Sequence, residues 1–219
     1  LADLDRLDFN KNEFYILRHA EADHNVKKII ACKDSGGTLS HLTLKGKLRV
    51  KEVAQQLKKE KINIIYASPF TRTKEVATMI NKELKVKIIF DKRLAEIDSG
   101  IFNGRLIKEY EDFMGDRLNQ FTKEVPGGEN LNDVRKRGWA FLNEVNQKNQ
   151  NKKILVISHG DPLYVFLGTA LGYTPLEIIE KISYPEVGTW RHMEFKNYPK
   201  NGFGEVDIHR PFFDEIYLR

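Results

Sequence analysis

Five side chains able to take part in phosphoryl transfer each follow a short apolar run of the sequence. They are two imidazoles, two guanidiniums and one carboxylate: His19, His159, Arg18, Arg72 and Glu96. A neutral imidazole attacks phosphorus and holds a covalent phosphoryl group, while a carboxylic acid protonates the departing oxygen. Guanidinium groups bind phosphate oxygens through paired hydrogen bonds and offset their charge. This combination indicates phosphoryl transfer, provided that the fold brings the five groups together.

The pattern of apolar residues predicts the elements that position these side chains. Strands are expected at 13–17, 62–67, 86–90 and 153–158, which are short apolar runs. Helices are expected at 43–60, 68–81, 131–147 and 162–171. Thr43 supplies an N-cap for the first helix, and Pro69 stands at the start of the second. Strands that alternate with helices predict a three-layer α/β/α fold around a mostly parallel sheet.

The five candidates share one topological position. The carboxyl ends of parallel strands meet at the same edge of a sheet, and ligand sites of α/β proteins lie just beyond that edge. A single histidine or arginine at a strand end is most often a surface or hydrogen-bonded residue, so none of the five identifies a site alone. Their recurrence after four predicted strands indicates a shared site.

Composition excludes several classes of protein. Of the 219 residues, 41% are hydrophobic and 31% are charged, which is typical of a folded domain and not of a disordered chain. The single cysteine, Cys32, excludes a disulfide scaffold and fits a reducing compartment. The net charge of +5 arises from basic residues mixed with acidic ones, so charge alone does not indicate a nucleic-acid-binding protein. The most apolar stretch, 161–177, is shorter than the roughly 20 residues that cross a bilayer. We therefore expect a cytoplasmic protein with no membrane partner.

Several segments resemble one enzyme family. The segment 17–21, Leu-Arg-His-Ala-Glu, resembles the Arg-His-Gly-Glu signature of the histidine phosphatase superfamily, which includes the cofactor-dependent phosphoglycerate mutases. The similarity continues through Asn25, the segments 42–46, 67–73, 93–104 and 126–137, and the Ser158-His159-Gly160 motif. It covers residues 14 to 195. The chain is identified as a member of this superfamily, and the resemblance implies the phosphoglycerate mutase-like fold.

The resemblance also implies a mechanism. His19 is then the nucleophile that forms a phosphohistidine, and Glu96 acts as general acid and later as base toward water. The phosphoryl oxygens are held by three residues, with help from Asn25: Arg18, Arg72 and His159. The mechanism requires no metal ion or other cofactor, and its partner is a small phosphorylated substrate. Four further residues lack zinc-type spacing and are interpreted as surface or packing residues: His24, His41, His192 and Cys32.

Departures from the family pattern favour hydrolysis. The mutases that resemble this chain carry an arginine directly after the acid and a tyrosine two residues later, both for binding a phosphoglycerate. This chain has Ile97 and Ser99 at those positions. We therefore expect a phosphomonoesterase, with a mutase-type phosphotransferase as an alternative. Ala20 replaces the commonest glycine and is not expected to inactivate the enzyme, and Asn130 stands where a serine is frequent.

The end of the chain resembles a different protein. Residues 204–216 follow a linker-like stretch and are similar to a segment of class I isoleucyl-tRNA synthetases. The chain does not begin with methionine, and we expect a processed product or a domain of a longer protein. The expected division is a lead-in at 1–11, a histidine phosphatase-like domain at 12–198 and a tail at 199–219. A second alternative is therefore a phosphatase-like accessory module of such an ATP-dependent synthetase, with tRNA as a partner only in that case.

The sequence leaves the substrate open among sugar phosphates, nucleotides, phosphoproteins and tRNA-linked phosphates, and it does not indicate the oligomeric state. The less periodic stretch from 91 to 128 is expected to form loops and short helices over one end of the sheet, with 98–128 as a lid. The aromatic residues of this stretch are interpreted as packing residues rather than as a stacking surface for substrate: Phe102, Tyr110, Phe113 and Phe121.

Overall fold

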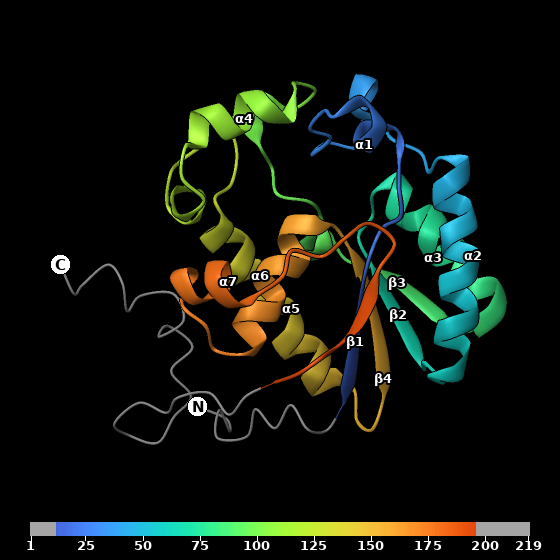
Figure 1. Cartoon of the computed structure of the whole chain (residues 1–219). Coiled ribbons are helices and arrows are strands. Elements are labelled where there is room, and N and C mark those ends of the chain that lie inside the picture. The colour runs from blue at the N-terminus through green and yellow to red at the C-terminus, as the bar shows by residue number, and fades with distance from the viewer. Residues whose placement is uncertain (1–11, 196–219) are drawn as a thin grey trace, which may run out of the picture.

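The computed structural model describes residues 12–195, which form a five-stranded sheet between two layers of helices (Figure 1). The strands are β1 (Glu13–Arg18), β2 (Ile64–Ala67), β3 (Lys87–Phe90), β4 (Lys153–Ser158) and β5 (Trp190–Met193). Their order across the sheet is β3-β2-β4-β1-β5. The first four strands in this order run parallel, and β5 pairs with β1 in the antiparallel sense. The predicted α/β/α architecture with a mostly parallel sheet is confirmed.

Alternate residues of the strands point to opposite faces and build two cores. One face is covered by α2 (Leu44–Lys59) and α3 (Thr71–Leu84), and the other by α5 (Leu131–Lys148), α6 (Gly160–Ala170) and α7 (Pro175–Lys181). Phe14 and Ile16 of β1 pack in the core on the α5 side. Tyr15 and Leu17 of the same strand pack in the core on the α2 side. A strand buried on both faces is apolar throughout, which explains why this run does not alternate with polar residues.

Local capping explains where two of the predicted helices begin. The Thr43 side chain accepts a hydrogen bond of 3.0 Å from the Gly46 backbone N–H, so α2 begins as predicted. At the start of α5, the Asn130 side chain accepts from the Asp133 N–H at 3.0 Å, and the Asp133 carboxylate accepts from the Asn130 N–H at 3.2 Å. Asparagine caps a helix as well as serine does, so the unusual residue at 130 leaves the helix start intact.

The observed secondary structure differs from the prediction in the bounds of one helix and in one additional strand. The helix expected at 68–81 begins at Thr71 and ends at Leu84, so Pro69 precedes the helix and does not open it. The Asp34 carboxylate accepts hydrogen bonds from the Thr71 N–H at 2.8 Å and from its hydroxyl at 2.9 Å, and this cap comes from a distant loop. Strand β5 was not predicted, because it is an edge strand in which Met193 alone is fully buried.

Two segments lie beyond the carboxyl ends of the parallel strands, namely α1 (Asp23–Lys27) and the cap, which we define as residues 98–128 (Figure 1). The cap contains α4 (Ile107–Met114) and the short 3-10 helices η5 (Gly100–Phe102) and η6 (Leu118–Phe121). This confirms the prediction of loops and short helices at one end of the sheet. Four buried residues form a small separate cluster in the cap: Phe102, Tyr110, Met114 and Val125. Phe102, Tyr110 and Phe113 pack together as predicted and Phe121 packs in the main core, while Tyr110 also lines the cavity described below.

The two ends of the cap meet. The Glu129 N–H donates to the Asp98 carbonyl at 2.7 Å, and the Ile101 N–H donates to the Pro126 carbonyl at 3.2 Å. Gly100 adopts a left-handed conformation (φ 51°) and lies so close to the 126–128 backbone that a β-carbon there would collide with it. The cap therefore leaves and rejoins the main domain at a single point.

The predicted lead-in at 1–11 and tail at 199–219 lie outside the described residues. The division of the chain and the resemblance to a synthetase segment therefore stay predictions. Within residues 12–195, no helix has the length and apolar character needed to cross a membrane.

Candidate active site

His19 directly follows β1 and is held by the backbone on both sides. Its N–H donates to the Ser158 carbonyl and its own carbonyl accepts from the Gly188 N–H, both at 3.0 Å. The Nδ1 atom lies 2.8 Å from the Ala20 carbonyl and must donate, because a carbonyl only accepts. The Nε2 atom is buried and has no hydrogen-bond partner. Burial, reinforced by the Arg72 charge, lowers the pKa of His19 well below its ordinary value, so the ring is neutral with a free electron pair on Nε2.

His159 follows the adjacent strand β4, and its ring centroid lies 5.3 Å from that of His19. Its Nδ1 accepts from the Arg72 Nε at 3.2 Å, so its Nε2 carries the proton and donates to the Ser68 hydroxyl at 2.8 Å. Burial lowers the pKa of His159 well below its ordinary value. Both ring nitrogens are thus occupied, and His159 must exchange one of these contacts before it can contact a phosphoryl oxygen.

Two guanidiniums supply buried donors without partners. Arg72 is only 1% exposed, and its Nη2 donates to the Ala31 carbonyl at 3.0 Å while its Nη1 is buried with no partner. Burial lowers the pKa of Arg72 to about 10, so the side chain stays charged at neutral pH. Arg18 donates through Nη1 to the Pro185 carbonyl at 2.7 Å, and its Nε is buried with no partner. Buried donors without acceptors are costly, which indicates that an anion satisfies them when bound.

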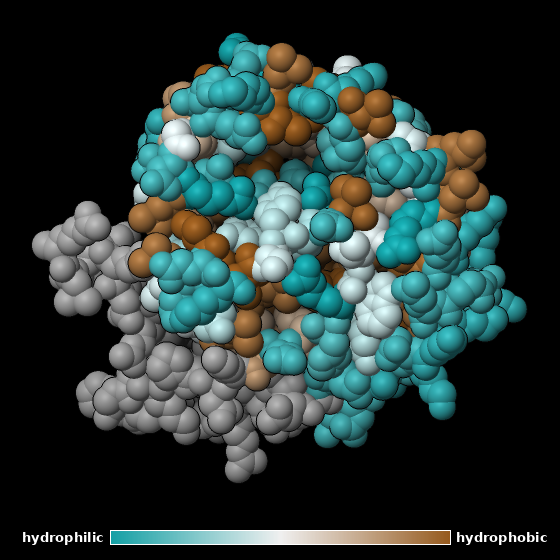
Figure 2. All heavy atoms as spheres, viewed as in Figure 1, coloured by the Kyte–Doolittle hydropathy of each residue, from teal (hydrophilic) through white to brown (hydrophobic). Residues whose placement is uncertain are grey.

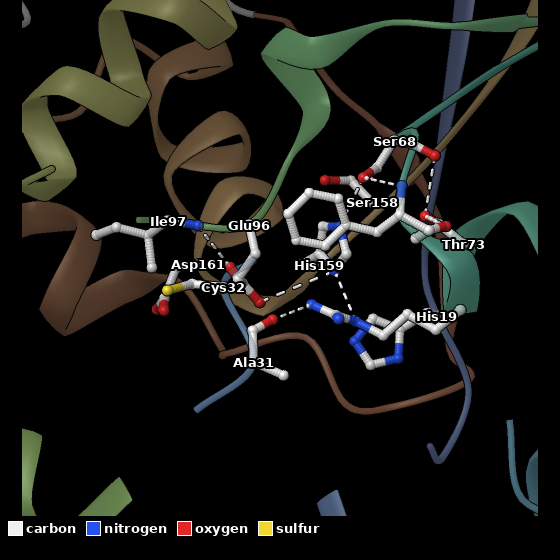
Figure 3. A network of polar contacts seen from close by, with 12 residues as sticks. His19, Ala31, Cys32, Ser68, Thr73, Glu96, Ile97, Ser158, His159 and Asp161 are labelled. Atoms are coloured by element: carbon white, nitrogen blue, oxygen red, sulfur yellow. Dashed lines mark hydrogen bonds and ion pairs between the residues drawn. The ribbon is translucent and has the colours of Figure 1, made fainter. Parts of the chain in front are cut away.

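Glu96 lies in the loop after β3 and reaches toward His159 (Figure 3). Its Oε1 accepts from the Ile97 N–H at 3.0 Å, and its Oε2 lies 4.0 Å from His159 Nδ1. Burial, followed by the nearby Asp161 charge, raises the pKa of Glu96 to about 7. A carboxyl group with this pKa holds its proton long enough near neutrality to act as a general acid.

An ion pair from α5 fixes the loop that carries Glu96. Arg137 donates to both oxygens of Glu129 at 2.9 and 3.0 Å, to the Arg93 carbonyl at 2.6 Å and to the Glu96 carbonyl at 3.2 Å. Glu129 also accepts from the Asp98 N–H at 3.0 Å. The backbone is therefore held on both sides of the carboxyl group. The match of 126–137 to the family pattern is explained by this contact to the site.

Asn25 and His24 form a hydrogen-bonded pair at the start of α1. The Asn25 amide oxygen accepts from the Ala22 N–H at 3.0 Å, and its nitrogen lies 3.1 Å from His24 Nε2. Because His24 Nδ1 lies 2.8 Å from the Ser40 hydroxyl, the ring is held at both nitrogens. Burial lowers the pKa of His24 to about 3, so it is neutral. The predicted phosphate contact of Asn25 stays a prediction.

A cavity of about 290 Å³ connects these groups to the surface. Figure 2 shows the molecule hollowed between α4 and the main domain. The inner wall carries Arg18, Arg72, Glu96 and Asn25, whereas His19 and His159 are fully buried behind it. The outer wall is formed largely by the cap, including Arg117, and by two polar residues outside the cap and outside the predicted set: Asp161 and Tyr184. Four parallel strands thus bring five predicted residues to one place, as expected.

Sequence reasoning missed several residues of the cavity wall, among them His24, Asp161, Arg117 and Tyr184. His24 was interpreted as a surface or packing residue, but it lines the cavity with its ring centroid 5.3 Å from that of His19. Its position immediately before Asn25 was an available signal. Asp161 follows the His159-Gly160 motif by one residue, which was also a signal. Arg117 and Tyr184 had none, because they lie in segments without periodicity.

Three further residues that were interpreted as surface or packing residues do not line the cavity, namely His41, His192 and Cys32. His41 Nδ1 contacts Glu75 at 2.6 Å on the surface, and His192 lies exposed on β5. Burial raises the pKa of Cys32 to about 11, so its thiol is protonated. Residues 12–195 contain no group of three or more histidine, cysteine or acidic side chains arranged to hold a metal ion.

Comparison with known proteins agrees with this geometry. Residues 14–200 match the histidine phosphatase superfamily (branch 1). The chain is 32% identical over 162 residues to phosphoserine phosphatase 1 of Hydrogenobacter thermophilus, which covers 72% of this chain and 75% of that protein. It is 31% identical over 165 residues to a probable phosphoglycerate mutase of Salmonella choleraesuis, which covers 73% and 75%. A solved mycobacterial glucosyl-3-phosphoglycerate phosphatase shares the fold, with a TM-score of 0.72 at 20% identity over 82% of this chain and 91% of that one.

Proposed function

Because this chain belongs to the histidine phosphatase superfamily and is a phosphatase of that family, we propose that it hydrolyses small phosphomonoesters through a phosphohistidine on His19, without a metal ion. The observation that carries the proposal is the free Nε2 of His19 beside buried guanidinium nitrogens that lack partners. An imidazole nitrogen that carries no proton can attack phosphorus. Guanidinium nitrogens that lack an acceptor can bind the phosphoryl oxygens.

The reaction proceeds in two steps. Nε2 of His19 attacks phosphorus, the bond from phosphorus to the ester oxygen breaks, and Glu96 gives that oxygen its proton. Arg18 and Arg72 hold the phosphoryl oxygens in both steps, with contacts from His159 and Asn25. Water then attacks the phosphohistidine while the Glu96 carboxylate accepts its proton, which releases phosphate and restores the neutral imidazole. The two guanidiniums supply the positive charge that a metal ion supplies in other phosphatases.

Hydrolysis is favoured over a mutase reaction by the residues after the acid. Ile97 is 3% exposed and lines the cavity with an apolar side chain, and Ser99 is 4% exposed. Neither side chain offers the arginine and tyrosine contacts that the related mutases use for a phosphoglycerate. The relatives include both a phosphoserine phosphatase and a probable phosphoglycerate mutase, so the test includes both reactions.

The test is hydrolysis of para-nitrophenyl phosphate by the full 219-residue chain in the presence of EDTA, with trapping of the phosphoenzyme by rapid quenching. We expect turnover that EDTA does not reduce and a phosphate adduct that is labile in acid and stable in base. Both disappear in His19→Ala and persist in the matched control His192→Ala, whose imidazole is exposed on β5. Turnover that requires a metal ion, or an adduct that survives in His19→Ala, would contradict the proposal. Conversion of 3-phosphoglycerate to its isomer instead of release of phosphate would indicate a mutase.

A further inference from the structure

The outer part of the cavity carries a third guanidinium, that of Arg117, which is not among the proposed ligands of the phosphoryl group. Arg117 lies at the start of η6 in the cap and lines the wall with Asp161 and Tyr184. Arg18 and Arg72 belong to the inner wall, where they are the proposed ligands of the phosphoryl oxygens. Arg117 is therefore available to the other half of the substrate, the leaving group.

Aromatic rings hold the Arg117 guanidinium in place. Its central carbon lies 4.8 Å from the centroid of Tyr164 and 5.1 Å from that of Tyr184. Its Nη2 is buried and makes no hydrogen bond. Arg117 forms an ion pair with Asp161, in which Nη2 lies 3.8 Å from Oδ1, too far for a hydrogen bond. A fixed, charged donor nitrogen that makes no hydrogen bond is a binding group for an acceptor.

The surroundings of Arg117 select a group with a single negative charge. Asp161 at 3.8 Å and Glu111 in the same wall oppose a second phosphate, which carries almost two charges at neutral pH. A carboxylate carries one charge, and its planar oxygens match the fork of a guanidinium. The cavity volume of about 290 Å³ lies just below the roughly 300–1,000 Å³ typical of pockets for drug-sized ligands, so the leaving group is small.

The ring of Tyr184 contacts both Arg18 of the phosphate site and Arg117. Arg18 of the phosphate site lies 5.2 Å from the centroid of this ring, and Arg117 lies 5.1 Å from it. The Tyr184 hydroxyl donates to Asp161 at 3.2 Å, which fixes the ring. Because both guanidiniums contact one ring, a carboxylate on a small leaving group lies within reach of Arg117 when the phosphoryl group is bound at Arg18. We propose that Arg117 binds a carboxylate on the leaving group, so that the preferred substrates are small phosphorylated carboxylic acids. This inference rests on the proposed function.

Two substrates that differ only by the carboxylate test the proposal. O-Phosphoserine is O-phosphoethanolamine with a carboxylate added, and the ratio of their kcat/KM values cancels effects on the common chemistry. We expect the wild-type chain to prefer phosphoserine. In Arg117→Gln the ratio falls about tenfold to one hundredfold, as expected for loss of a hydrogen-bonded ion pair. The ratio falls because kcat/KM for phosphoserine is lower in the variant. Added inorganic phosphate inhibits the wild-type chain and Arg117→Gln to the same extent.

Arg105→Gln is the matched control, because Arg105 is an exposed arginine of the cap that does not line the cavity. It removes the same charge and leaves the ratio unchanged. A wild-type chain without preference for phosphoserine, or an equal fall of the ratio in both variants, overturns the role of Arg117. These outcomes are distinct from failure of the proposed function, in which para-nitrophenyl phosphate is not hydrolysed and no phosphohistidine forms.

Discussion

The inner wall of the cavity and the cap are built in different ways. His19, His159 and Arg72 are at most 1% exposed, and each is tied to the sheet or to a helix that packs on it. The cap has only four buried residues in its own cluster, and Ile107 at the start of α4 is 38% exposed. The proposed catalytic groups are part of the main domain, whereas the wall that carries Arg117, the proposed contact to the leaving group, is a small attached unit. We infer that the first sets the reaction and the second selects the substrate.

The strongest test of this division is Arg72→Ala on the inner wall. Arg72 has an unpaired Nη1 and also orients His159, so its removal is expected to lower kcat/KM at least about a thousandfold. The measurement is steady-state hydrolysis of para-nitrophenyl phosphate at matched amounts of folded protein.

Arg135→Ala is its control, because Arg135 is equally buried and its guanidinium bonds to neighbouring residues such as Asn132 and Tyr173. This variant is expected to lose stability and to keep its activity per folded molecule. Similar losses of activity in both variants would mean that Arg72 acts through the fold and not through the phosphoryl group.

Glu96→Gln tests the acid role of Glu96 in the first step of the proposed reaction. Without an acid, release of a poor leaving group slows by about one hundredfold or more, whereas nitrophenolate leaves without a proton. We expect a large fall in the hydrolysis of phenyl phosphate and a small fall for para-nitrophenyl phosphate. The comparison is made by kcat/KM for the two esters on the same enzyme preparation, because this quantity excludes the later hydrolysis of the phosphohistidine, in which Glu96 acts as base for both esters. Equal losses on both would argue against an acid role.

Substitutions in the two regions are also expected to differ in their cost to the free energy of unfolding. Leu142→Ala removes a fully buried side chain from the large core and is expected to cost about 3–5 kcal/mol. Met114→Ala removes an equally buried side chain from the small cap cluster, which can collapse or open locally, and is expected to cost about 2 kcal/mol or less. Urea unfolding measures both values. Equal costs would show that the cap is as tightly coupled as the main core.

Asp161→Asn is expected to have the smallest effect, a displacement of the pH profile. Glu96 must be protonated to act as acid, so hydrolysis of phenyl phosphate declines as the pH rises through the Glu96 pKa of about 7. The Asp161 charge raises that pKa, so its removal lowers the pKa and moves the decline to lower pH. A pH series of kcat/KM measures the shift, because this quantity reports the pKa of the free enzyme. A decline that stays at the same pH or moves to higher pH would show that Asp161 does not raise the pKa of Glu96.

The inner wall was predictable because its residues directly follow buried strands. An apolar run such as 154–157 identifies a strand, and a parallel sheet then determines which strand ends meet. The helix start at Thr71 was not predictable, because its cap is the side chain of Asp34, 37 residues away in the chain. Arg117 and Tyr184 lie in irregular segments, where only the three-dimensional path brings them to Asp161. Edge strand β5 lacked the apolar pattern that burial imposes.

The narrow junction at which Asp98 meets Glu129 has a consequence for how such enzymes diverge. A segment whose ends already touch costs little loop-closure entropy when it is lengthened, shortened or exchanged. The sheet and its buried histidines keep their register while the inserted segment varies, because the junction is held by backbone hydrogen bonds together with the Glu129 carboxylate. Transplanting the cap between relatives at this junction is therefore a direct route to new substrate preferences on an unchanged phosphoryl-transfer scaffold.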